Sequence, residues 1–272
     1  MTQEALPSVG NYLSFVMQFI MAFGIAFLLP ILLIDVATLS GNPVMPWVLA
    51  ALALVCIAAV WSINLHNFMD GINGLLAFQA VFVFVALGVL CAHSGHAVDA
   101  QRIGLFAAAT LGFLPFNFPR ARIFMGDVGS GSLGLLVAAS IGWQVAAMPN
   151  LIYAGLIACS GFVVDATATL LSRVLGGRRW YSAHREHLYQ WLVRSGMSHA
   201  KVVALYMTWN LLIVTPALLL AAIEADDVST TGALAAGGAA QAGFVYALAL
   251  LVWVFGKQYC LRAVSRSRKR AA

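Results

Sequence analysis

Amides and carboxylates recur at a fixed spacing in one polar segment of this sequence. Asn64, Asn67 and Asp70 stand at every third position, and Gly71 and Gly74 follow them. On a helical turn this spacing brings the three side chains to neighbouring positions. Their oxygen atoms can bind a hard cation or accept hydrogen bonds from a nucleotide. A polar cap that ends a helix at a membrane interface is the alternative interpretation.

A second segment, Asn117–Gly134, combines one acidic residue with several glycines. Asp127 follows Gly126 and precedes Gly129–Ser132, after which an apolar run begins. Glycines before a helix suit phosphate binding, because backbone N–H groups and the helix dipole attract anions. A bridging Mg²⁺ would reconcile the carboxylate with a phosphate, since Mg²⁺ binds through one or two carboxylates plus substrate phosphates. The alternative is a glycine-rich loop that permits close packing of spans.

Basic residues gather around a third segment, His184–His187. Clustered arginine and histidine at a membrane face suit anionic phosphates, although a solvated loop is the alternative. The spacing of the two histidines fits zinc poorly, because no third ligand is evident. Further basic residues near this segment and near Asp127 are Arg173, Arg178, Arg179, Arg194, Lys201, Arg120 and Arg122.

One carboxylate lies inside an apolar run. Asp165 is about two helical turns from the end of a predicted span, where a charged group is costly. It is either a functional residue or a hydrogen-bonding group that locks helices together, and the sequence favours neither.

The elements that must position these residues are membrane helices. The chain has 272 residues, 62% hydrophobic and only 9% charged, whereas soluble domains are about 25% charged. We therefore predict an all-α polytopic membrane bundle, a single domain over residues 1–272 with a basic tail over 256–272. The eight predicted spans are Tyr12–Ile34, Pro46–Ile63, Leu75–Ala92, Ile103–Phe116, Leu133–Met148, Leu151–Leu171, Val202–Ile223 and Gly238–Phe255.

The loops between these spans differ sharply in charge. Of the 15 Lys and Arg residues, only Arg102 falls outside one alternating set of loops and the tail. The positive-inside rule then makes this set cytoplasmic. It comprises Asn64–Gly74, Asn117–Ser132, Ser172–Lys201 and the C-terminal tail, and it holds all three polar segments. A chemical site is therefore expected at the cytoplasmic membrane face.

Other classes of protein fit less well. No aromatic-basic module accompanies the tail, which argues against nucleic acid as a partner. The cysteines are scattered and form no CxxC pair, which argues against a disulfide framework or a zinc site. Met1–Gly10 lacks the positive region of a cleavable signal peptide.

Together the three segments resemble the polyprenyl-phosphate N-acetylhexosamine-1-phosphate transferases, the WecA, WbpL and MraY group of glycosyltransferase family 4. The matching text is NLHNFMDGINGL from Asn64, GFLPFNFPRARIFMGDVGSGSLG from Gly112, and DATATLLSRVLGGRRWYSAHREHLYQ from Asp165. The resemblance implies transfer of a HexNAc-1-phosphate from a UDP-HexNAc to undecaprenyl phosphate, with release of UMP. It implies a bacterial inner-membrane protein that starts a lipid-linked surface glycan such as O-antigen. The protein would be embedded in the lipid bilayer. The resemblance does not fix the oligomeric state, and a homodimer is one of the alternatives.

The resemblance also implies residue roles. Asp127 would be the main Mg²⁺ ligand (Mn²⁺ is the alternative), with Asn67 beside it, and Asp70 a catalytic or metal-supporting carboxylate. Phe124 would stack on uracil and Asn73 would bond its edge. The residues implied for the diphosphate or sugar are His184, Arg185 and His187. The further substrate-binding candidates are Asn64, Asn117 and Arg122, the last two also positioning the loops together with Asp165.

Two departures from the family pattern stand out. Many bacterial relatives have an aspartate where this chain has Asn73. The family also carries an Asp-Asp pair in an earlier cytoplasmic loop, and no such pair lies upstream of Asn64, so we expect a member that lacks its N-terminal spans. Two other hypotheses are a non-catalytic remnant that binds lipid or nucleotide sugar, and a transporter with Asp70 and Asp165 on its path.

Overall fold

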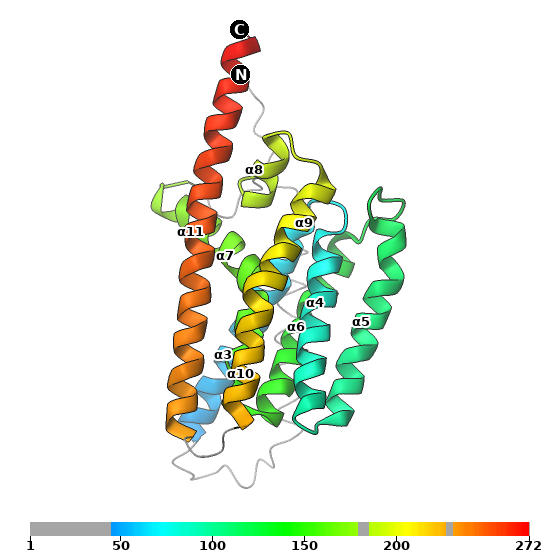
Figure 1. Cartoon of the computed structure of the whole chain (residues 1–272), viewed down its shortest axis with the longest axis vertical. Coiled ribbons are helices and arrows are strands. Elements are labelled where there is room, and N and C mark those ends of the chain that lie inside the picture. Colours follow the sequence, from blue (N-terminus) through cyan, green and yellow to red (C-terminus); the bar gives the residue numbers. More distant parts are fainter. Residues whose placement is uncertain (1–44, 179–184, 227–230, 272) are drawn as a thin grey trace.

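The computed structural model describes residues 45–178, 185–226 and 231–271, and throughout these ranges the chain forms helices and no strand. This confirms the predicted all-α class (Figure 1). The elements are α3 (Met45–Met69), α4 (Leu75–His93), α5 (Ala97–Asn117), α6 (Gly126–Ala147), a 3₁₀ turn (Pro149–Leu151), α7 (Ala154–Leu175), α8 (Leu188–Arg194), α9 (His199–Trp209), a π-helical turn (Asn210–Val214), α10 (Thr215–Asp226) and α11 (Thr231–Ala271).

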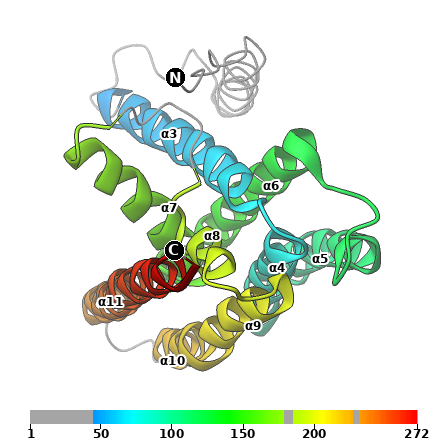
Figure 2. The same ribbon diagram turned by 90° about the horizontal axis from the view of Figure 1, so that it is seen from above.

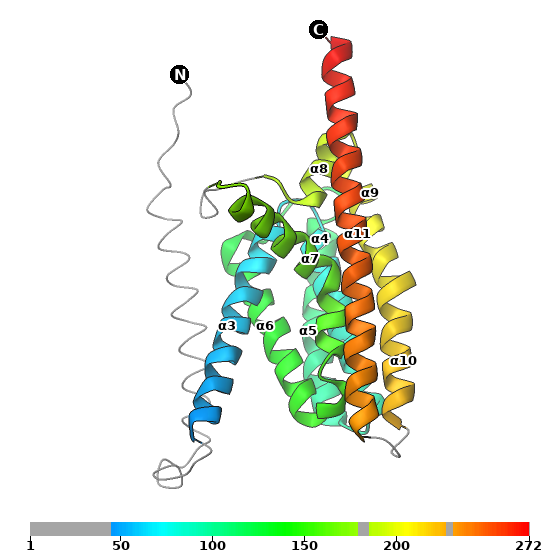
Figure 3. The ribbon, with the colours of Figure 1, turned by 90° about the vertical axis from the view of Figure 1, so that its left-hand side faces the viewer.

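The long helices lie side by side, and short α8 lies at one end of the bundle (Figures 1 and 3). Seen from that end, α8 lies among α7, α9 and α11, each of which it contacts (Figure 2). We call this the polar end: here α3 ends, α6 begins and α8 lies. All three polar segments of the sequence meet at this end.

Six helical segments are long and apolar enough to cross a membrane, by length and composition. They are Leu75–His93, Ala97–Asn117, Gly126–Ala147, Pro149–Leu175, His199–Ala225 and Gly237–Arg266. Each contains or overlaps one predicted span. The predicted span Pro46–Ile63 falls in α3. Within α3 the segment Leu54–Met69 is apolar but shorter than the six candidate spans. The predicted span Tyr12–Ile34 lies outside the described residues.

The helices extend further into the polar segments than predicted. We expected the fifth span to begin at Leu133, but α6 begins at Gly126, so Gly129–Ser132 are helical. Gly126 has φ +67°, a conformation that glycine adopts without strain, and it turns the chain into the helix. Asp127 then lies in the first turn, where a carboxylate complements the helix dipole.

The predicted loop Ser172–Lys201 also contains structure. It holds α8, and α9 begins within it, at His199. The signal for α9 was present in the sequence, because Ser198 is a favoured N-cap and its hydroxyl accepts from the Lys201 N–H at 3.4 Å.

Helices α3 and α6 approach each other closely. Ser62 Oγ donates to the Gly134 carbonyl at 2.7 Å, and a Cβ added to Gly134 would lie 2.7 Å from the Ser62 carbonyl oxygen. Only glycine fits at this crossing, as is common where membrane helices pack through small residues. The contact fixes how far the end of α3 lies from the start of α6.

Some polar groups are buried within the spans and bond to one another. Gln79 donates to the Ala158 carbonyl at 3.1 Å and accepts from Asn210 Nδ2 at 2.8 Å. Thr215 Oγ1 donates to the Asn210 carbonyl at 2.9 Å across the π-helical turn. These bonds tie α4, α7 and the π-helical turn after α9 together.

Candidate active site

The ends of α3 and α6 bring two predicted site residues into contact. Asn67 Nδ2 donates to Asp127 Oδ1 at 3.2 Å and to Ser130 Oγ at 3.0 Å. Asp127 is exposed, whereas Ser130 is fully buried one turn further along α6. Ser130 was not among the predicted site residues, and its position three residues after Asp127 is the signal that could have found it.

A second carboxylate lies close enough to Asp127 for the two charges to repel. Burial and then the charge of Asp127 raise the pKa of Asp70 from 3.8 to about 7. A cation would be stabilised where the charge of one carboxylate disfavours the ionisation of another. The polar end therefore has the charge pattern of a divalent-cation site.

The oxygen ligands present suit a metal ion that takes some of its coordinating atoms from a substrate. Among the described residues there is no group of three or more His, Cys, Asp or Glu side chains that could hold a metal ion. Asp70, Asp127 and the Asn67 amide fit Mg²⁺, which commonly binds one or two carboxylates and completes its shell with water and phosphate oxygens. Asn67 turns its amide nitrogen toward Asp127, so its oxygen would bind a cation only after the amide rotates.

Asn117 joins the first polar segment to the second. Its Oδ1 accepts from the Gly74 N–H at 2.7 Å, and its Nδ2 donates to the Ile123 carbonyl at 3.0 Å. Asn73 adds a second link, because its Nδ2 donates to the Pro119 carbonyl at 3.1 Å. The Asn73 side chain thus lies beside the segment that carries Phe124.

Phe124 and Arg122 lie on the surface of this segment. Phe124 is 76% exposed, which leaves its ring open to a flat ligand. Arg122 is exposed, and its guanidinium lies 5.6 Å from the centre of the Phe116 ring. Asn64 is different: it is buried and donates to the Val60 carbonyl of its own helix at 2.8 Å.

In the third segment the charges are already paired in part. Glu186 accepts from Arg173 at 2.6 Å and from Arg178 at 2.8 Å. Arg185 is exposed. His184 lies outside the described residues, so the structure does not place it.

His187 is packed into the protein. It is 3% exposed, and its ring stacks between Phe68 and Tyr189, with centroid distances of 6.1 and 5.9 Å. Burial lowers the pKa of His187, while the carboxylate of Asp165, with an oxygen 4.0 Å from Nδ1, opposes that shift. His187 therefore lies beside the end of α3, beneath the surface of the site.

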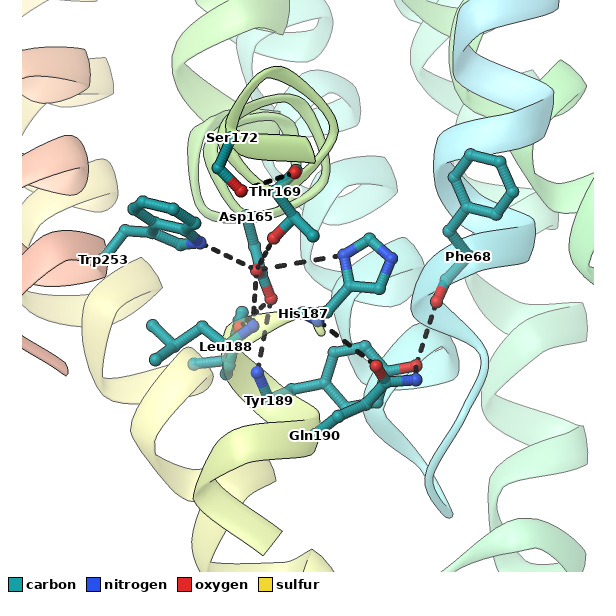
Figure 4. Close-up of polar contacts among 10 residues, drawn as sticks. Phe68, Asp165, Thr169, Ser172, His187, Leu188, Tyr189, Gln190 and Trp253 are labelled. Atoms are coloured by element: carbon teal, nitrogen blue, oxygen red, sulfur yellow. Dashed lines mark hydrogen bonds and ion pairs between the residues drawn. The ribbon is translucent and has the colours of Figure 1, made fainter. Parts of the chain in front are cut away.

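Asp165 lies at the centre of a hydrogen-bond cluster (Figure 4). It is 2% exposed. Its carboxylate accepts hydrogen bonds from the Leu188 N–H at 2.7 Å, the Tyr189 N–H at 3.3 Å, the Tyr206 hydroxyl at 2.7 Å, the Trp253 indole at 3.1 Å and the Thr169 hydroxyl at 3.4 Å. These donors come from α7, α8, α9 and α11, so the residue joins four helices.

The sequence did not single out Tyr189, Tyr206 or Trp253 as partners of Asp165. The sequence indicated only that a buried carboxylate needs hydrogen-bond donors nearby, because burying its charge is costly. The chain contains many hydroxyl and indole groups, and only the packing of the helices selects among them.

Comparison with known proteins identifies the family of the chain. The family model described as glycosyl transferase family 4 matches residues 6–143, about half of the chain. A decaprenyl-phosphate N-acetylglucosaminephosphotransferase of Mycobacterium tuberculosis is 31% identical over 181 residues, which is 59% of this chain and 45% of the relative. A phospho-N-acetylmuramoyl-pentapeptide-transferase of Staphylococcus saprophyticus is 31% identical over 172 residues, 60% of this chain and 50% of the relative.

A third relative is a Bacillus subtilis protein named as a probable undecaprenyl-phosphate N-acetylglucosaminyl 1-phosphate transferase. It is 29% identical over 147 residues, 53% of this chain and 41% of the relative. The chain thus spans about half the length of the curated relatives it matches. The family match covers the ends of α3, α5 and the start of α6, where Asn67, Asp70 and Asp127 meet. The chain belongs to glycosyl transferase family 4.

Proposed function

We propose that the chain transfers a HexNAc-1-phosphate from a UDP-HexNAc to undecaprenyl phosphate and releases UMP, as a step toward a lipid-linked surface glycan. The observation that carries this proposal is the meeting of Asn67, Asp70 and Asp127 where α3 ends and α6 begins. The relatives' names support the class of reaction, because two name a phosphotransferase or phosphate transferase together with a polyprenyl phosphate, and the third names a phospho-N-acetylmuramoyl-pentapeptide-transferase.

In this proposal Asp127 and Asp70 hold Mg²⁺ with the help of Asn67. Mg²⁺, when bound, neutralises the diphosphate and stabilises charge that develops on the transferred phosphoryl group. Mn²⁺ could take the same place, since it favours the same oxygen ligands.

The remaining residues bind and orient the nucleotide sugar. Phe124 offers an exposed ring for the uracil, and the side chain of Asn73 lies beside the same segment. Arg185 and Arg122 are exposed cations that suit the diphosphate. In this proposal the acceptor phosphate attacks the transferred phosphoryl group directly and UMP leaves, so the protein contributes mainly positioning and charge stabilisation.

The proposal places the polar end at the cytoplasmic face of the bacterial inner membrane. The distribution of charge supports this orientation, since all Lys and Arg residues except Arg102 belong to the loops and tail of this side. Asp99 and Glu224 lie on the opposite side. A UDP-sugar made in the cytoplasm would reach the polar end directly.

The test is UMP release by the purified chain in detergent with undecaprenyl phosphate and UDP-N-acetylglucosamine, with and without Mg²⁺. We expect Mg²⁺-dependent release that Asp127→Ala abolishes, while Asp99→Ala at the opposite end leaves it unchanged. Nucleotide-sugar binding without release would identify a non-catalytic member instead. Release that persists at full rate in Asp127→Ala would refute the metal assignment.

A further inference from the structure

Tyr189 connects the third polar segment to the first. Its hydroxyl donates to the Phe68 carbonyl at the end of α3 at 2.9 Å and accepts from Gln190 Nε2 at 3.0 Å (Figure 4). The whole side chain is buried. Tyr189 therefore spans from the first turn of α8 to the residue that lies two positions before Asp70.

The end of this link lies against a residue with no side chain. A Cβ added to Gly71 would overlap the Tyr189 hydroxyl and lie 2.9 Å from its Cζ. Any larger residue at position 71 would push Tyr189 away or displace the backbone beside Asp70. The glycine of the first segment is thus matched to the tyrosine of the third.

The other end of the link is held by Asp165. Its two carboxylate oxygens accept from the Leu188 and Tyr189 N–H groups, two of the backbone donors that a helix start leaves without partners within the helix. Gln190 Oε1 accepts from the His187 N–H at 3.2 Å, which fixes the residue before the helix as well. The entry into α8 is therefore bonded at three successive residues.

We propose that Asp165 is a positioning residue, which acts through α8 and Tyr189 to set the His187 segment at a fixed distance from Asp70 and Asp127. This inference rests on the proposed function. In that function Asp70 and Asp127 belong to one part of the site and the His187 segment to the other, and Asp165 and Tyr189 hold the two parts together. Asp165 is buried and touches no substrate; its effect is on where Arg185 and the neighbouring residues lie.

An amide cannot replace this carboxylate. The five groups that hydrogen-bond to Asp165 all donate, and they approach both oxygens, whereas asparagine offers one oxygen and an NH₂ group that can only donate. Asp165→Asn therefore keeps the shape of the side chain but sets its NH₂ group either against the Tyr189 N–H or against the N–H groups of Leu188 and Trp253. It is the sharpest test of the role.

The experiment compares four variants of the full chain in detergent. Asp165→Asn removes the support of α8, and Tyr189→Phe removes only the hydroxyl with its bonds to Phe68 and Gln190. Trp253→Phe and Tyr206→Phe are matched controls, because each removes one donor to the same carboxylate and leaves the bonds from α8 to Asp165 and to α3 in place. Amide hydrogen exchange over residues 185–194 is measured together with UMP release from UDP-N-acetylglucosamine.

We expect Asp165→Asn to raise exchange over 185–194 and to lower kcat about 100-fold, the scale of a displacement of about 1 Å. Tyr189→Phe should keep the N–H groups of Leu188 and Tyr189 protected and still lower kcat. Both controls should retain kcat within about threefold of the parent chain, even where their thermal stability falls. Mg²⁺ should activate every variant at the same concentration.

The proposal is overturned if Asp165→Asn keeps both exchange and kcat at the level of the parent chain. It is also overturned if the two controls lose kcat as strongly as Asp165→Asn, because the carboxylate would then only stabilise the fold. If the parent chain itself releases no UMP, the proposed function fails, while the exchange of residues 185–194 still shows whether Asp165 holds α8.

Discussion

Asn117 Oδ1 accepts a hydrogen bond from the Gly74 N–H at 2.7 Å, and both groups are buried. Gly74 has φ +80° and leads directly into α4, so this bond holds the turn that follows Asp70. The amide of Asn117 also donates to the Ile123 carbonyl at 3.0 Å, one residue before Phe124. One side chain therefore sets the distance between the proposed metal site and the proposed uracil platform.

We expect Asn117→Leu to destabilise the protein by about 1–3 kcal/mol, because it leaves the buried Gly74 N–H without a partner. Asn117→Asp should act differently: it still accepts from Gly74 but sets a carboxylate against the Ile123 carbonyl. Thermal unfolding in detergent measures the first effect, and the KM for UDP-N-acetylglucosamine the second. Unchanged stability in Asn117→Leu would contradict the bracing role.

Gly134→Ala should push α3 and α6 apart. The new Cβ would meet the backbone of Ser62 and Ile63 at 2.7 and 2.8 Å, and such overpacking costs about 1–3 kcal/mol. Because Asn67 and Asp127 lie about two turns or less beyond this crossing, Mg²⁺ activation should shift to higher concentration. Gly142→Ala is the control on the same helix, since its added Cβ meets nothing within 4 Å.

The raised pKa of Asp70 predicts a pH-dependent stability. This pKa is about 7 in the folded protein, whereas an aspartate without such surroundings has a pKa of 3.8, so folding favours the protonated form. The stability that this form contributes is then lost as pH rises from about 4 through 7. Asp70→Asn should flatten this decline, so that in EDTA its apparent Tm exceeds that of the parent chain at pH 8 and not at pH 4. Added Mg²⁺ should raise the Tm of the parent chain more than that of the variant.

Phe124→Ala should leave the fold intact and weaken nucleotide binding. The ring is 76% exposed, so its loss removes little packing, while stacking on a base is worth about 1–3 kcal/mol. We expect KM for UDP-N-acetylglucosamine to rise about 5- to 150-fold with kcat nearly constant. Leu175→Ala is the control, because Leu175 is 86% exposed on the C-terminal turn of α7. Equal effects of the two substitutions would exclude a specific stacking role.

Hydropathy was sufficient to predict most of the spans, because length and composition alone decide whether a helix can cross a membrane. The start of α6 was predicted seven residues late. The segment Gly126–Ser132 is polar and glycine-rich, and hydropathy assigns such residues to a loop, whereas Gly126 and Asp127 together make a helix start. Local conformation, which hydropathy does not measure, decided this boundary.

The site was predictable in part for a similar reason. The three-residue spacing pointed to Asn67 and Asp70, although α3 ends at Met69 and Asp70 lies just beyond it, and Asp127 is the single acidic residue of its segment. The links between segments were not predictable: Tyr189 to Phe68, Asn117 to Gly74 and Trp253 to Asp165 join residues 43 to 121 positions apart. Such contacts depend on how the helices pack, and a single sequence carries no local pattern for them.

The order in which the chain is synthesised gives the Asp165 cluster a consequence for membrane insertion. The carboxylate emerges on α7, its α8 and α9 donors follow, and the indole of Trp253 comes only with α11, the last helix. Until α11 has entered the bilayer, Asp165 lacks that partner and α8 lacks one of the three helices that it contacts. The proposed site is therefore completed late in biogenesis, and a nascent chain arrested before α11 would carry Asn67, Asp70 and Asp127 while the Asp165 cluster that holds α8 is incomplete.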